Sequence, residues 1–239
     1  MESEKKKLSS QTKLLVSFKS KEEISIENLS LVDILDLKDP SKGSLGSWKI
    51  KSIREIIKIF GKKKEISATL GDVSDTRKII KELRKFDELK LNYIKFGIFS
   101  ESQNQIENLM KKIYEEKIKT KLVPVIFVDK IFIKNWIFEN FEKIKSFGFK
   151  DLLLDTYSKN SGNLLEICTI NFLENFIDQS YKFSIKVGLA GKLKSDQIPK
   201  LLLLGPKILG FRSAACSNND RNASISNSKI RELHSHFNS

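Results

Sequence analysis

The segment Ile34-Leu35-Asp36-Leu37-Lys38-Asp39-Pro40 is the part of the chain that decides the fold. It is an apolar run that ends abruptly in two carboxylates and a lysine. Successive side chains of a β-strand point to opposite faces, so Asp36 and Lys38 are predicted to share one face with Ile34. Placing charges at the end of an apolar strand costs several kcal/mol per ion unless each charge is paired or used. The segment therefore predicts a strand that carries an acid and an amine for chemistry.

Strand and helix patterns alternate along the rest of the chain. Apolar strand segments are predicted at residues 14–18, 34–39, 65–70, 93–99, 122–128, 151–156, 183–190 and 207–216. Helical patterns are predicted at 20–29, at 48–60 with Ser47 as its cap, around 79–83, 106–113, 136–144 and 164–176, in a short segment ending near 204, and at 226–237. Mostly apolar strands that alternate with helices indicate a parallel sheet whose faces are covered by the helices.

The number of these units distinguishes two α/β architectures. Eight units in 239 residues favour a closed (β/α)8 TIM barrel, because single barrels commonly have about this length. An open doubly wound sheet would be expected to carry a G-x-G-x-x-G sequence in its first turn, and the segment after Phe18 has none. We therefore expect one α/β domain, a barrel spanning residues 13–239, preceded by a frayed tail at residues 1–12.

Composition limits the classes of protein to which the chain belongs. The strongest apolar run, Leu201 to Leu204, is followed at once by Gly205 and Pro206, so no segment is long enough to span a membrane. The N-terminal residues lack the apolar stretch of a secretory signal, and a cytoplasmic protein with no membrane partner is expected. Cys168 and Cys216 lack the spacing of a zinc site or a disulfide framework, so both are expected to be reduced.

The net charge of +13 raises the alternative of a nucleic-acid-binding protein. Only six of the positive residues are arginines, and the lysines are scattered along the chain instead of forming one block. The run Lys62 to Lys64 is interpreted as a solvated turn in preference to a phosphate-binding patch. We expect no nucleic-acid partner, and we expect the charge to do no more than steer anionic substrates.

Active sites of TIM barrels lie at the C-terminal ends of the strands. The position of a residue along its strand therefore indicates whether it is a candidate for catalysis or for packing. The charged residues predicted at these ends are Asp36, Lys38, Asp72, Lys95, Asp129, Asp155, Lys159, Lys192 and Arg212. Lys95 lies in the middle of a strand, where an outward lysine would have to thread between the covering helices. An inward orientation is therefore predicted for it, and the charged residues converge on one mouth.

Several of these residues have simpler structural explanations. Asp72 and Asp129 directly follow their strands and could cap the next helices instead of taking part in chemistry. Lys159 lies in a Ser- and Gly-containing loop and could be a solvated surface lysine. These alternatives remain open at the level of sequence.

Thiol and imidazole chemistry are both disfavoured. Cys216 could be a nucleophile, but without a histidine nearby a buried structural thiol is the preferred interpretation. The only histidines, His234 and His236, are predicted to lie exposed in the last helix. Histidine acid–base catalysis and a metal site are therefore not expected.

The lysines suggest a covalent mechanism. An amine nucleophile needs a lowered pKa, and crowding lysines together in a partly desolvated site lowers the pKa by disfavouring each ammonium. Lys38, Lys95 and Lys159 form such a cluster in the predicted barrel, and Asp36 and Asp155 are placed to move protons. This combination is that of a lyase that forms a Schiff base.

Glycines near the last two strands point to a phosphate. Gly188 and Gly191 flank the end of the seventh strand, and Gly210, Arg212 and Ser213 close the eighth. Barrels often bind phosphate at these two strands through backbone N–H groups and a helix N-terminus. The expected substrate is therefore a small phosphorylated carbonyl compound.

Several motifs, in matching order and spacing, resemble a known enzyme family. They are Asp36-Leu37-Lys38-Asp39-Pro40 with Lys42-Gly43-Ser44-Leu45-Gly46, Ser67 to Asp72, Tyr93 to Gly97, Leu154-Asp155-Thr156 with Lys159, Gly188 to Gly191, and Gly210 to Ser213 with Cys216, Asp220 and Arg221. From Leu14 to about Ile225 the chain resembles the (5-formylfuran-3-yl)methyl phosphate synthases, the 4-(hydroxymethyl)-2-furancarboxaldehyde phosphate synthases of methanofuran biosynthesis.

The resemblance implies a (β/α)8 barrel that condenses two molecules of glyceraldehyde 3-phosphate to a phosphorylated furan aldehyde, with loss of phosphate and water. Such an enzyme is a carbon–oxygen lyase that serves one-carbon metabolism. The resemblance implies Lys38 as the Schiff-base lysine and Lys95, Lys159, Asp36 and Asp155 as the other charged catalytic residues. It also implies that no metal or organic cofactor is required.

Two loops depart from the family pattern. Ser47-Trp48 and Ser217-Asn218-Asn219 stand where the family has other sequences, and both segments are expected in substrate loops. The same lysine cluster also fits a class I aldolase that acts on another small sugar phosphate, which is the alternative function. Because small barrels often associate, a homo-oligomer is expected.

Overall fold

Eight parallel strands close into a barrel in the computed structural model, which describes residues 12–158 and 160–237. The strands are β1 (Lys13–Phe18), β2 (Ile34–Leu37), β3 (Glu65–Thr69), β4 (Tyr93–Gly97), β5 (Lys121–Phe127), β6 (Asp151–Asp155), β7 (Lys186–Leu189) and β8 (Ile208–Phe211). Each strand pairs with the next one in the chain, and β8 pairs with β1. The predicted TIM barrel is confirmed.

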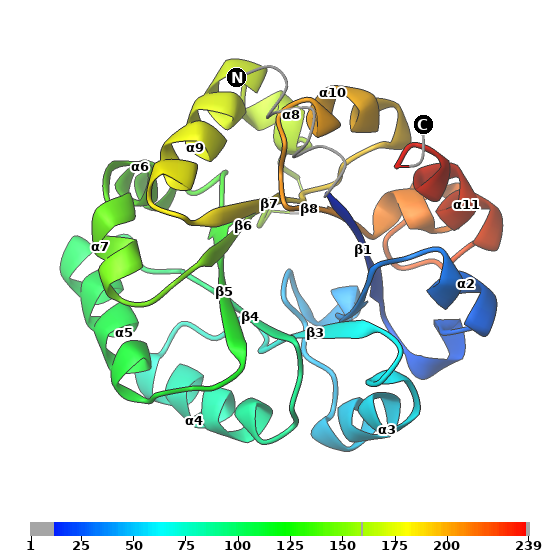
Figure 1. Ribbon diagram of the computed structural model, residues 1–239, viewed down its shortest axis with the longest axis horizontal. Coiled ribbons are helices and arrows are strands. Elements are labelled where there is room, and N and C mark those ends of the chain that lie inside the picture. The colour runs from blue at the N-terminus through cyan, green and yellow to red at the C-terminus, as the bar shows by residue number, and fades with distance from the viewer. Residues whose placement is uncertain (1–11, 159, 238–239) are drawn as a thin grey trace.

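Helices surround this ring of strands, as Figure 1 shows in a view along the barrel. They are α2 (Ile26–Ser30), α3 (Ile50–Phe60), α4 (Thr76–Asp87), α5 (Gln103–Glu115), α6 (Ile131–Glu139), α7 (Phe141–Ser146), α8 (Leu164–Ile167), α9 (Ile170–Lys182), α10 (Ile198–Leu202) and α11 (Asn227–Ser235). The longer helices are amphipathic, and α3, for example, buries Ile53 and Ile56. The main apolar core is therefore the layer between the strands and the helices.

The two faces of β2 follow the predicted alternation. Leu35 lies in the apolar layer beneath the helices, whereas Ile34 belongs to a smaller apolar cluster inside the barrel. Asp36 shares the inner face with Ile34, and in register it stands opposite Ser17 of β1 and Ser67 of β3. The polar end of the strand thus points into the barrel.

Two helices predicted as continuous are broken. The segment predicted at 136–144 divides at Asn140 into α6 and α7, and the segment predicted at 164–176 divides at Cys168 and Thr169 into α8 and α9. The Thr169 hydroxyl accepts a hydrogen bond from the N–H of Phe172 and so caps α9. Hydrophobic periodicity misses such breaks, because the apolar spacing continues across them.

The helix after β2 begins later than predicted. Ser47 is not its cap, because α3 starts at Ile50 with Lys49 as the N-cap residue. Trp48 is buried in the preceding loop, where its indole N–H donates to the carbonyl oxygen of Phe18. The burial of this indole ties the loop after β2 to the end of β1.

The last two strands are shorter than predicted. β7 begins only at Lys186, because Phe183 ends α9 and Ser184 has a φ of 58°. β8 ends at Phe211, and Ser213–Ala215 form a short 3-10 helix. The polar residues after both strands therefore lie in loops at the mouth.

The tail predicted at residues 1–12 lies outside the described residues except for Thr12. The buried Thr12 hydroxyl donates to the carbonyl oxygen of Pro206, which joins the start of β1 to the loop before β8. Within the ranges that the structure describes, no helix is long and apolar enough to cross a membrane.

Candidate active site

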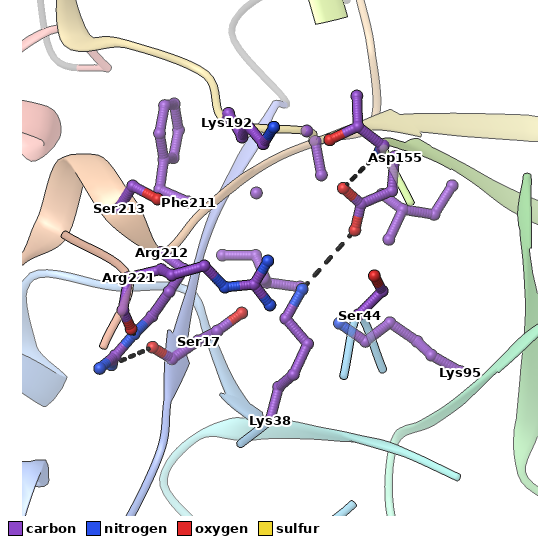
Figure 2. Close-up of a pocket in the computed structure, with 16 residues that line it drawn as sticks. Ser17, Lys38, Ser44, Lys95, Asp155, Lys192, Phe211, Arg212, Ser213 and Arg221 are labelled. Carbon is purple, nitrogen blue, oxygen red and sulfur yellow. Dashed lines mark hydrogen bonds and ion pairs between the residues drawn. The ribbon is translucent and has the colours of Figure 1, made fainter. Parts of the chain in front are cut away.

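Polar side chains from several strands meet in a cavity at the C-terminal ends of the barrel strands (Figure 2). The predicted site residues that line it are Lys38, Lys95, Asp155, Gly191, Gly210, Arg212 and Ser213. Asp36 lies beside the cavity in contact with Lys95. Gly188 lies in the barrel wall instead, where an added Cβ would be 2.9 Å from Leu153. Lys159 lies outside the described residues.

The centre of the site is a buried ion pair between Asp36 and Lys95, whose Oδ2 and Nζ atoms are 2.7 Å apart. Asp36 has no exposed surface, and Lys95 is 3% exposed. The carboxylate also accepts hydrogen bonds from the hydroxyls of Ser17 and Ser67, each at 2.6 Å. Both serines are brought beside Asp36 by the strand register, so the buried charge is fully partnered.

Burial and neighbouring charges act in opposite directions on this pair. Burial opposes ionisation of Asp36, but the ammonium groups of Lys95 and Lys38 outweigh it and hold the pKa of the carboxyl below its ordinary value. Burial is also the largest influence on Lys95, and together with the nearby charge of Lys38 it lowers the pKa of that amine despite the attraction of Asp36. Lys95 therefore releases a proton more readily than an exposed lysine, as expected of crowded amines.

Lys38 follows β2 and points across the mouth toward Asp155 at the end of β6, as Figure 2 shows. The Lys38 Nζ lies 3.6 Å from Asp155 Oδ2, and 12% of the lysine side chain is exposed. Asp155 also accepts a hydrogen bond from the N–H of Thr156, which fixes its carboxylate. Lys38 is thus the more accessible amine of the site, whereas Lys95 is enclosed by the barrel.

Asp72 holds a loop and does not cap the helix that follows it. Its carboxylate accepts hydrogen bonds from the backbone N–H groups of Ser44 and Leu45, at 2.9 and 2.7 Å. Asp75 caps α4 instead, by accepting from the N–H of Lys78. The helix-cap interpretation of Asp72 is wrong, and the residue sets the loop after β2 at the edge of the cavity.

Asp129 holds the neighbouring loop in the same way, and Ser44 joins the two loops by donating to the carbonyl oxygen of Tyr157. The Asp129 carboxylate accepts hydrogen bonds from the N–H groups of Tyr157 and Ser158, at 2.9 and 2.7 Å. The following helix, α6, begins at Ile131 with Lys130 as its N-cap residue. The helix-cap interpretation is wrong here too, because Asp129 supports the loop that follows β6 and Asp155.

Arg212 is committed to a buried network within the protein. Its guanidinium forms a two-point ion pair with Glu23, with nitrogen–oxygen distances of 2.7 and 3.0 Å. Its remaining N–H groups donate to the carbonyl oxygens of Ser17, Arg221 and Ala223. All five N–H groups are thus engaged, so Arg212 positions the loop after β8 and offers no free donor to a phosphate.

Lys192 was predicted to lie at the mouth and Arg221 belongs to the motifs of the family resemblance, but neither was predicted to be a catalytic or binding residue. Arg221 reaches over the cavity (Figure 2), and its Nη2 donates to the carbonyl oxygen of Gly43 at 3.2 Å. Its Nε is buried and has no hydrogen-bond partner among the residues described. The Lys192 ammonium donates to the carbonyl oxygens of Ser158 and Ser161. Their positions after β7 and β8 are the sequence signal that could have identified both.

The thiols and imidazoles lie outside the cavity. Cys216 is buried, its Sγ lies 3.1 Å from the carbonyl oxygen of Arg212, and burial raises the pKa of its thiol to about 11. Cys168 is also buried and free. His234 and His236, at the end of α11, were predicted to be exposed, but both are partly buried. Across residues 12–158 and 160–237, no group of three or more His, Cys, Asp or Glu residues is placed to hold a metal ion.

Solved structures of low sequence identity share the architecture. The chain is similar to phosphoribosyl anthranilate isomerase from Thermus thermophilus, with a TM-score of 0.64 and 13% identity over 95% of this chain and 98% of the other. It is also similar to 3-keto-L-gulonate-6-phosphate decarboxylase from Vibrio cholerae, with a TM-score of 0.61 and 11% identity over 95% and 98% of the two chains. At such identities the likeness shows the fold alone.

Proteins related in sequence identify the family and not only the fold. The (5-formylfuran-3-yl)methyl phosphate synthase of Methanobrevibacter smithii is 31% identical over 212 residues, which cover 84% of this chain and 88% of the relative. The synthase of the same name from Methanocaldococcus jannaschii is 30% identical over 224 residues, covering 84% and 89%. The family model described as 4-HFC-P synthase matches residues 14–234. The chain therefore belongs to the 4-HFC-P synthase family.

Proposed function

We propose that the protein is a (5-formylfuran-3-yl)methyl phosphate synthase that condenses two molecules of glyceraldehyde 3-phosphate, with loss of one phosphate and of water. The enzyme would be a carbon–oxygen lyase that supplies the furan of a methanofuran-type coenzyme. The support is membership of the family together with a cavity lined by Lys38, Lys95 and Asp155, with Asp36 in contact with Lys95 beside it.

Lys38 is the proposed nucleophile. Its amine adds to the aldehyde carbon of one substrate, and loss of water leaves a protonated imine between that carbon and Nζ. The positive nitrogen withdraws electrons from the neighbouring C–H bond, which makes that proton easier to remove. Asp155, 3.6 Å away, stabilises the positive charge. Lys38 is preferred over Lys95 because more of its side chain is exposed, 12% against 4%.

Lys95 and Asp36 are the proposed pair for proton transfer. Each elimination on the way to the furan needs a base that takes a proton from carbon and an acid that delivers one to the departing oxygen. Lys95 can do both, because its lowered pKa brings the neutral amine within reach while Asp36 stabilises the ammonium. Lys159 is retained as a catalytic residue on the family resemblance.

The substrate phosphate is proposed to bind at the ends of β7 and β8. Gly191 and Gly210 keep the wall free of side chains there, and Ser213, Lys192 and Arg221 surround it. The buried, unpartnered Nε of Arg221 would gain a phosphate oxygen as its acceptor. The cavity volume of about 50 Å³ is small beside the roughly 300–1,000 Å³ of ligand sites, so the side chains across the opening must swing outward on binding.

The single observation that carries the proposal is the convergence of Lys38, Lys95, Asp36 and Asp155 at one cavity in a chain of this family. The test is to incubate the purified, metal-free protein with glyceraldehyde 3-phosphate and to follow the ultraviolet band of a furan aldehyde, with confirmation of the product mass. A growing band that is lost in Lys38→Ala supports the synthase. No band, with reducible adducts still forming, would favour a class I aldolase acting on another small sugar phosphate.

A further inference from the structure

A second cavity lies at the N-terminal end of the barrel, opposite the active site, and takes no part in the proposed function. Its volume is about 570 Å³, which falls within the range of roughly 300–1,000 Å³ typical of sites for small ligands. Between the two lies a cavity of only about 20 Å³, lined by Leu15, Val123 and Leu153 among others, which is far too small for a ligand. The second cavity is therefore a separate site.

Six lysines surround this cavity: Lys117, Lys119, Lys121, Lys150, Lys186 and Lys207. They come from the loops that precede β5, β6 and β8 and from the first residues of β5 and β7. The backbone N–H of Lys186 donates to the carbonyl oxygen of Lys150, and that of Lys207 to the carbonyl oxygen of Val187, which holds these segments side by side. The positive charges thus converge on one concavity.

Little negative charge balances these lysines. In the part of the chain that the structure describes, Asp151 is the only acidic residue that lines the cavity, and none of the six lysines lies within salt-bridge distance of a carboxylate. Burial lowers the pKa of Lys207, and the charges of Lys186 and Lys13 lower it further. Such an arrangement is self-repelling unless an anion neutralises it.

We propose that this cavity binds a small anion that carries two or more phosphate groups. One phosphate dianion would leave most of the ammonium charge unbalanced, whereas linked phosphates spread negative charge around the ring of lysines. A second copy of this chain is a poor occupant, because its own net charge of +13 adds to the repulsion. The charges ring one cavity instead of forming the extended track that a nucleic-acid backbone requires, so a small molecule is favoured.

The test is isothermal titration of the full chain with inorganic triphosphate at two salt concentrations. We expect one saturable site at this cavity, weaker at the higher salt, and at least about tenfold weaker binding in the double variant Lys186→Gln/Lys207→Gln. The matched control is Lys58→Gln/Lys81→Gln, which removes the same charge from exposed positions on α3 and α4 and should bind as the wild type does. Thermal unfolding of both variants verifies that they are folded.

Four results would overturn the proposal. The first is that no saturable binding is seen, and the second is that both double variants weaken binding equally. The third is that Arg221→Ala abolishes binding while Lys186→Gln/Lys207→Gln leaves it unchanged, and the fourth is that a short DNA duplex binds more tightly than triphosphate with the same dependence on the lysines. The third result would place the triphosphate in the active site, and the fourth would assign the lysines to nucleic acid. Because the readout is binding, the test stands whether or not the furan synthase activity is found.

Discussion

Removing the amine of the buried ion pair tests the electrostatic account of the site. Lys95→Met keeps most of the length of the side chain but leaves Asp36 as a fully buried carboxylate without its contacting cation. At 2.7 Å and an effective dielectric constant of about 20, the lost attraction is on the order of 6 kcal/mol. Protonation of Asp36 in the variant limits this loss, so we expect the free energy of unfolding to fall by about 3–5 kcal/mol near pH 8.

The loss of stability in Lys95→Met is expected to depend on pH, in a direction set by the pKa of Asp36. In the wild type the lowered pKa of Asp36 stabilises the fold above the carboxyl's unfolded-state pKa of about 3.9, and this stabilisation is lost as pH falls through the lower folded-state value. In Lys95→Met, burial without the contacting amine raises the folded-state pKa of Asp36, so the folded variant binds an extra proton and loses stability as pH rises. The loss relative to the wild type should therefore be smaller at pH 5 than at pH 8.

The assay is urea unfolding followed by circular dichroism at pH 5 and pH 8, with the double variant Asp36→Asn/Lys95→Met as the control. Removing both charges leaves no unpaired ion at this position, so the double variant should recover much of the stability that the single variant loses. A loss below about 1 kcal/mol at pH 8, an equal loss at both pH values, or a double variant no more stable than Lys95→Met would refute this account of the pair.

Three further predictions concern residues around the mouth. Glu23→Gln should cost about 3 kcal/mol, because it leaves the buried Arg212 guanidinium without its charged partner, and a melting temperature unchanged in calorimetry would contradict this. Asp129→Ala frees the N–H groups of Tyr157 and Ser158, so kcat/KM should fall severalfold with less effect on the melting temperature; unaltered kinetics would argue against its support of the loop. Cys216, with its pKa raised to about 11, should react with a thiol reagent at pH 8 only after unfolding, and rapid reaction of the native protein would disprove its burial as an inert thiol.

The fold and the inner charged residues were accessible from sequence because both depend on local periodicity. Alternation along β2 is enough to predict that Asp36 points into the barrel. The inward orientation of Lys95 follows from the apolar cover that helices impose on the outside of a parallel sheet. These inferences need only the burial pattern, and the structure confirms them.

The partners of the mouth residues were not accessible in the same way. A carboxylate placed directly after a strand has the same sequence pattern whether it caps a helix or holds a neighbouring loop, and Asp72 and Asp129 do the latter. Arg212 is satisfied by Glu23, 189 positions earlier in the chain, and no periodicity reports such a contact. Long-range hydrogen bonds of this kind depend on how strands are placed around the barrel, so they emerge only from the structure.

The proposed function depends above all on a covalent imine between Lys38 and the substrate. The most direct measurement is reduction with borohydride in the presence of glyceraldehyde 3-phosphate, followed by mass spectrometry of the digested protein. We predict a stable adduct on the peptide that contains Lys38, formed only when substrate is present, and no adduct in Lys38→Ala. A furan product made without any trapped adduct, or an adduct found on Lys95 while Lys38 stays unmodified, would contradict the account.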